Sequence, residues 1–119
     1  MNIKYLGRPE TKRIIILHTP YATYEDYLVA QRAKGNLDAG VHYYIDKLGR
    51  VMVGRQENVY GSHLLAGYED SIFIAVGSTT DCARQALELL TADIICRYGS
   101  LGVVDTKWTI MQQPNNPEG

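Results

Sequence analysis

Cysteine, histidine and long apolar runs are all scarce in this chain of 119 residues. The two cysteines, Cys82 and Cys96, are 14 residues apart within a segment that we predict below to be one helix. They would then lie ~21 Å apart along its axis, beyond disulfide reach, so we expect two buried thiols. No apolar run approaches the ~20 residues of a membrane-spanning helix, so we expect no membrane partner.

An excess of charge of one sign is also lacking. The chain has twelve Lys and Arg residues and thirteen Asp and Glu residues, for a net charge of −1. This balance does not favour nucleic acid as a partner. The N-terminus, MNIKYLGRPETKR, has no apolar core of the kind found in signal peptides, and we therefore expect a cytoplasmic protein. The length predicts a single domain over residues 1–119.

Strand patterns dominate the first two thirds of the chain. Residues 13–18 and 71–76 are nearly continuous apolar runs, as in strands buried on both faces of a sheet. Between them, residues 38–55, DAGVHYYIDKLGRVMVGR, predict a hairpin: polar and apolar residues alternate over 41–46, and 50–54 return. Gly49 supplies the positive φ that the turn at 47–49 requires.

Two helices are predicted. Thr23-x-x-Asp26 resembles a capping box and opens a helix that ends at Gly35. Thr80 caps a longer one from about Asp81 to Tyr98, which Gly99 ends. The apolar stripe of this second helix consists of Ala83, Ala86, Leu87, Leu90 and Ile94. Further strands are expected at 3–6, near 58–60 and at 103–111, before a coil at 112–119.

Four segments in this order resemble the zinc-dependent N-acetylmuramoyl-L-alanine amidases and peptidoglycan recognition proteins. They are the strand that ends in His18, the hairpin from Gly40 to Arg55, the triplet Gly61-Ser62-His63 and the strand Ser71 to Ile74. The resemblance covers residues 12–117. It implies an α/β single domain in which a central mixed sheet of about five strands is flanked by helices.

The zinc site that the resemblance implies is largely missing. A hydrolytic zinc needs three protein ligands and one open position. His18 matches the first ligand, but the second position falls on Lys107 and the third on Asn115 or Pro117, none of which is a plausible zinc ligand. The family's cleft Tyr and general-base Glu correspond to Val41 and Ala75. We therefore expect no catalytic residue, no bound metal and no other cofactor.

A binding cleft is expected where the metal would have been. We assign it to His18, Val41, Tyr43, His63, Tyr68, Lys107 and Trp108. Lys107 is expected close to the place of the ion. Strand alternation puts His42 on the face opposite Val41 and Tyr43, so we predict that His42 is a hydrogen-bonded structural residue.

Three hypotheses for function follow from the resemblance. The first is a catalytically inactive amidase-like protein that acts by binding, as a phage or prophage regulator or inhibitor of a host or phage protein. The second is a module that binds peptidoglycan or a muropeptide without cleaving it. The third is an active N-acetylmuramoyl-L-alanine amidase with an unconventional site.

Overall fold

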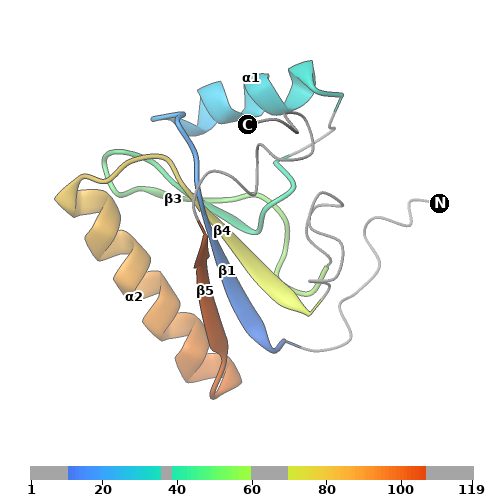
Figure 1. The fold of residues 1–119 in the computed structure, drawn as a ribbon, viewed down its shortest axis with the longest axis vertical. Helices are drawn as coiled ribbons and strands as arrows, with labels where there is room; N and C mark the ends of the chain where they lie inside the picture. Colours follow the sequence, from blue (N-terminus) through green and yellow to red (C-terminus); the bar gives the residue numbers. More distant parts are fainter. Residues whose placement is uncertain (1–10, 36–38, 60–69, 107–119) are drawn as a thin grey trace.

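Five strands form one mixed sheet in the order β3-β2-β4-β1-β5 in the computed structural model, which describes residues 11–35, 39–59 and 70–106 (Figure 1). The elements are β1 (Arg13–His18), α1 (Tyr24–Ala33), β2 (Tyr43–Ile45), β3 (Val51–Val53), β4 (Ser71–Val76), α2 (Asp81–Tyr98) and β5 (Gly102–Thr106). This is the predicted α/β fold.

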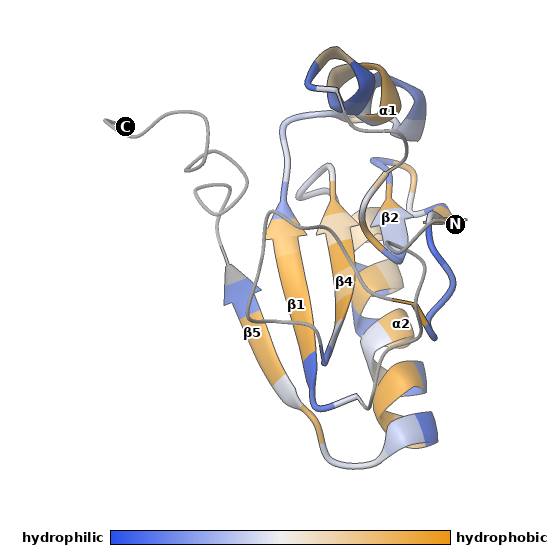
Figure 2. Ribbon diagram, turned by 90° about the vertical axis from the view of Figure 1, so that its right-hand side faces the viewer, coloured by the Kyte–Doolittle hydropathy of each residue, from blue (hydrophilic) through white to orange (hydrophobic). Residues whose placement is uncertain are grey.

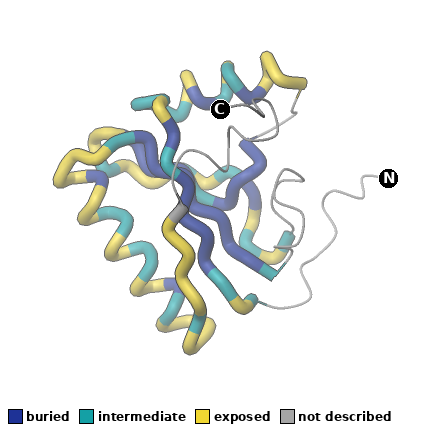
Figure 3. The backbone as a smooth tube through the Cα atoms, in the orientation of Figure 1, coloured by how far each residue is buried: buried dark blue, intermediate teal, exposed yellow. Residues whose placement is uncertain are grey.

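The centre of the sheet is parallel. β1 pairs with β4 on one side and with β5 on the other, and β2 pairs parallel with β4 and antiparallel with β3. The apolar runs of β1 and β4 are buried because both faces of the sheet are covered (Figure 3). His18 lies opposite Val76, so these two strands end together.

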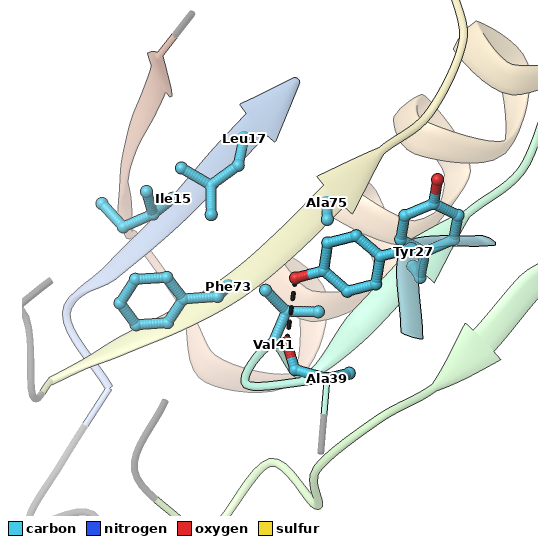
Figure 4. Packing of buried hydrophobic residues seen from close by; sticks show 8 residues of the cluster. Ile15, Leu17, Tyr27, Ala39, Val41, Phe73 and Ala75 are labelled. Carbon is cyan, nitrogen blue, oxygen red and sulfur yellow. Dashed lines mark hydrogen bonds between the residues drawn. The ribbon is translucent and has the colours of Figure 1, made fainter. Parts of the chain in front are cut away.

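The two faces of the sheet carry separate apolar clusters. One joins Tyr27 of α1 to Ile15, Leu17, Val41, Tyr44, Phe73 and Ala75 (Figure 4). The other joins Ala83 and Ile94 of α2 to Ile14, Ile16, Ile45, Ile72, Ile74 and Val76, with Ala86, Leu87 and Leu90 packed against it. The two helices therefore lie on opposite sides of the sheet, and the predicted apolar stripe of α2 is confirmed.

Both predicted helix caps are confirmed. The Thr23 hydroxyl accepts a hydrogen bond from the backbone N–H of Asp26 at 3.1 Å. The Thr80 hydroxyl accepts one from the N–H of Ala83 at 3.2 Å. Gly99, at φ 91°, ends α2 where predicted.

The hairpin strands are shorter than predicted, and one consequence drawn from them is wrong. Val41 and His42 form a bend ahead of β2, so the alternation of faces does not extend through Val41. Val41 packs in the α1-side cluster, whereas Tyr43 packs on the α2 side. The turn residue Gly49 has φ 81°, as predicted.

The prediction of buried thiols is also wrong, since both Cys82 and Cys96 are exposed. α2 turns Ile94 toward the sheet, and Cys96, two positions later, falls ~200° around the helix from it. No helix in the described part of the chain is long and apolar enough to cross a membrane. The strand predicted at 3–6, the end of the last strand and His63, Tyr68, Lys107 and Trp108 lie outside the described residues.

Candidate functional site

The topology singles out the edge of the sheet at which the parallel strands have their carboxyl ends. The chain leaves β1 for α1 on one face, and leaves the neighbouring parallel strand β4 for α2 on the other. In open α/β sheets, ligands bind outside the carboxyl ends of strands at such a divergence. His18 ends β1 at this point, so the candidate site lies around it.

Asp105 on β5 joins His18 there. The imidazole Nε2 lies 2.7 Å from the Asp105 carboxylate Oδ1, and the side chains are 30 % and 58 % exposed. Parallel pairing explains the contact, because Asp105 aligns with Ile16, two positions before His18 and on the same face. Figure 2 shows that β1 and β5 both end in hydrophilic residues, at the same end of the sheet. This pair is a polar, accessible feature that can accept and donate hydrogen bonds.

The residues behind this pair are closely packed. The backbone N–H of Thr19 donates to the Val76 carbonyl at 2.9 Å, which ties the end of β1 to the end of β4. The Tyr44 hydroxyl donates to the Tyr21 carbonyl, and burial raises the pKa of this phenol. Gly77 leaves no room for a side chain, since a Cβ there would collide with both of these oxygens. The backbone behind the His18–Asp105 pair is therefore held in place by hydrogen bonds and close packing.

Comparison with solved structures shows what shares this architecture. The N-acetylmuramoyl-L-alanine amidase LysC from Clostridium intestinale matches with a TM-score of 0.70 at 21 % identity, over 88 % of this chain and 78 % of its own. The Ph2119 endolysin, from a Thermus scotoductus bacteriophage, matches with a TM-score of 0.70 at 21 % identity, over 85 % and 75 %. The Drosophila peptidoglycan recognition protein SA gives 0.67 at 22 % identity, over 85 % and 69 %.

The protein has the fold of these amidases and recognition proteins. The resemblance read from the sequence is thereby confirmed at the level of fold. Neither a family model nor a curated protein matches the sequence itself.

Three of the seven predicted cleft residues, His18, Val41 and Tyr43, lie in the described part of the chain. His18 lies at the candidate edge, but Val41 is only 2 % exposed and packs in the α1-side cluster. Tyr43 lies on the other face, where its hydroxyl donates to Glu57. The structure thus does not bring Val41 and Tyr43 to one surface with His18. The cleft as a whole stays a prediction, because its other four members lie outside the described residues.

Tyr43 belongs instead to a polar cluster that holds residues 54–59 against the end of α2. Arg97 donates to both carboxylate oxygens of Glu57 at 2.7 Å, and the Tyr98 hydroxyl donates to one of them at 2.7 Å. The hydrogen bonds from Arg97 lower the pKa of Glu57 to about 2. Burial, together with the bond to Glu57, raises the pKa of Tyr43 to about 12. Glu57 thus accepts hydrogen bonds from three side chains, which join β2 and residues 54–59 to the end of α2.

Asp105 is the site residue that sequence reasoning missed. It lies two positions before Lys107, the residue that the resemblance aligns with the second zinc ligand. Alternate residues of a strand share a face, so the pattern that selected Lys107 also selects Asp105. Sequence alone gave no register between this strand and β1, and the register is what brings Asp105 to His18.

The residues that the structure describes do not fit a hydrolytic zinc. His18 and Asp105 supply two side-chain donors, whereas such an ion requires three and an open position. The described residues contain no group of three His, Cys, Asp or Glu side chains that could hold a metal ion. His42, a further imidazole, is fully buried with both ring nitrogens in internal hydrogen bonds. Its predicted structural role is confirmed.

Proposed function

We propose that this protein binds a ligand at the carboxyl edge of its sheet without hydrolysing it. The observation that carries the proposal is the His18–Asp105 pair. The imidazole that corresponds to the first zinc ligand of the amidases interacts with a carboxylate, and the sequence offers Lys107 and Asn115 or Pro117 at the remaining ligand positions.

Magnitudes argue against hydrolysis by this pair alone. A metal ion supplies several kcal/mol of transition-state stabilisation and generates the attacking hydroxide from bound water. A histidine base contributes typically about 10²–10⁴-fold. Asp105 can orient the His18 ring, but a carboxylate cannot stabilise the negative charge that develops on an amide oxygen. The pair therefore suits recognition better than catalysis.

For the ligand we infer a peptidoglycan fragment. The structures with this fold are named as N-acetylmuramoyl-L-alanine amidases and peptidoglycan recognition proteins. Such a fragment presents amide N–H groups and hydroxyls, and an exposed carboxylate can accept hydrogen bonds from both. A protein of a host or phage as partner, and a cytoplasmic location, stay predictions from the sequence.

Co-sedimentation with purified peptidoglycan tests the proposal. We expect the wild-type protein to sediment with the polymer, and Asp105→Ala to lose at least tenfold in affinity. The matched control is Glu88→Gln, which removes an exposed carboxylate from α2 and should bind like the wild type. Binding that is unchanged in Asp105→Ala would place the ligand elsewhere. Absence of wild-type binding would exclude peptidoglycan and favour the protein-partner hypothesis.

A further inference from the structure

His42 links three parts of the chain from a fully buried position. Its ring Nδ1 lies 2.9 Å from the backbone nitrogen of Phe73 in β4, and its Nε2 lies 2.7 Å from the carbonyl of Val59. The backbone repeats these connections, since the His42 N–H donates to the Phe73 carbonyl at 3.0 Å and its carbonyl accepts from Gly54 at 2.9 Å. The side chain is 0 % exposed. It therefore joins residues 54–59 to the central sheet.

The partners dictate the protonation state of the ring. The N–H of Phe73 can only donate, so Nδ1 must be bare. The Val59 carbonyl can only accept, so Nε2 must carry the proton. A second proton, on Nδ1, would oppose one N–H to another and leave a positive charge in the core.

Among the residues that the structure describes, the charged neighbours offer no unpaired carboxylate to such a charge. The carboxylates of the adjoining segments, Asp46, Glu57 and Asp70, are each paired with an arginine. Arg55, in the segment that His42 holds, is itself a buried cation. The two strands beside the ring contribute Tyr43 and Tyr44 but no further ionisable group.

We propose that His42 is an acid-sensitive pin, whose neutral ring holds residues 54–59 to β4 and whose protonation releases them. In the unfolded chain a histidine takes up its proton at pH ~6.5. The folded chain resists this proton, so stability is fully present above that pH and falls as the pH drops below it. If only the unfolded state is protonated, the folding equilibrium constant falls about 30-fold between pH 8 and pH 5.

Urea unfolding at pH 8, 6.5 and 5 tests the pin. The key variant is His42→Asn, whose side-chain oxygen can still accept from Phe73 but does not titrate. We expect His42→Asn to be less stable than the wild type at pH 8. Between pH 8 and pH 5, the folding equilibrium constant of His42→Asn should fall by a factor about 30 times smaller than that of the wild type. His18→Gln and His63→Gln are the matched controls and should keep the wild-type pH dependence that comes from His42. Equal pH dependence in the wild type and His42→Asn would refute the proposal.

Nuclear magnetic resonance of the wild type keeps the proposal testable if His42→Asn does not fold. At pH 7 the ring nitrogens should show a bare Nδ1 and a protonated Nε2. On acidification, hydrogen exchange of the Phe73 amide, corrected for its intrinsic rate, should accelerate more than tenfold by pH 5. A ring that titrates above pH 6 while the Phe73 amide stays equally protected would overturn the pin.

Discussion

Buried polar side chains in this domain fix loops and turns at the scale of single residues. Asp46 is 1 % exposed and accepts hydrogen bonds from the backbone N–H groups of Leu48 and Arg50, both at 2.9 Å. Burial raises the pKa of this carboxyl, but the bonds from Arg50 and Leu48 outweigh it and leave the pKa below its usual value. Asp46 thus holds the hairpin turn in its charged form.

Glu57 likewise acts as a charged carboxylate that holds a loop, here against the end of α2. Its partner Arg97 gives a testable prediction. Arg97→Gln removes both bonds to Glu57 and should lower the free energy of unfolding by about 1–2 kcal/mol at pH 7, measured with urea. Arg84→Gln, which breaks an exposed pair with Asp81 on the same helix, should change it by less than ~0.5 kcal/mol.

The pH dependence of that difference has a defined sign. The pKa of Glu57 is lowered from 4.5 to about 2, so its contribution is present above pH 4.5 and is lost as the pH falls toward 2. The gap between the wild type and Arg97→Gln should therefore narrow between pH 5 and pH 3. A gap that widens on acidification would contradict the assignment.

A substitution at Gly77 tests how tightly the residues behind the His18–Asp105 pair are packed. Gly77→Ala places a methyl group against the Tyr21 carbonyl and the Tyr44 hydroxyl, and should cost about 2–3 kcal/mol in urea unfolding. Adding Tyr44→Phe should recover part of the loss, because it removes one of the two oxygens. At Gly102 the nearest atom to a new Cβ is 3.6 Å away, so Gly102→Ala should be nearly neutral. Equal losses at both glycines would contradict this account.

At the scale of elements, sequence signals succeeded where they are local. The bounds of α2 were predicted at both ends, because Thr80 and Gly99 mark them chemically. The hairpin strands were overestimated, since alternation continues through Val41 while the backbone already bends there. The exposure of Cys96 was missed although the predicted apolar stripe indicates it, because Cys96 lies ~200° around the helix from Ile94.

Thr80 connects two elements, and its replacement should show this. The hydroxyl caps α2 and also donates to the Lys47 carbonyl in the hairpin turn at 2.7 Å. Thr80→Ala should lower the free energy of unfolding by about 1–2 kcal/mol, while Thr80→Ser, which keeps both bonds, should stay within ~0.5 kcal/mol. Thr23→Ala, which removes a cap alone, should cost about 1 kcal/mol. A Thr80→Ser variant as unstable as Thr80→Ala would show that the hydroxyl is not responsible.

At the scale of the whole molecule, the strand order creates the candidate site. Sequence placed His18 at the end of a buried strand, but only the parallel pairing of β1 with both β4 and β5 shows that Asp105 meets it. The family resemblance predicted the fold, and the solved structures confirm it. It could not supply the partner of His18, since that partner is not part of the matching motif.

The most direct test of the account is an assay for amide hydrolysis. Purified peptidoglycan is incubated with the protein, with and without added zinc, and released stem peptides are quantified against a heat-inactivated control. Because His18 and Asp105 supply only two donors, we predict no release above the control in either condition. Zinc-dependent release that disappears in His18→Ala would contradict the account and identify an active amidase.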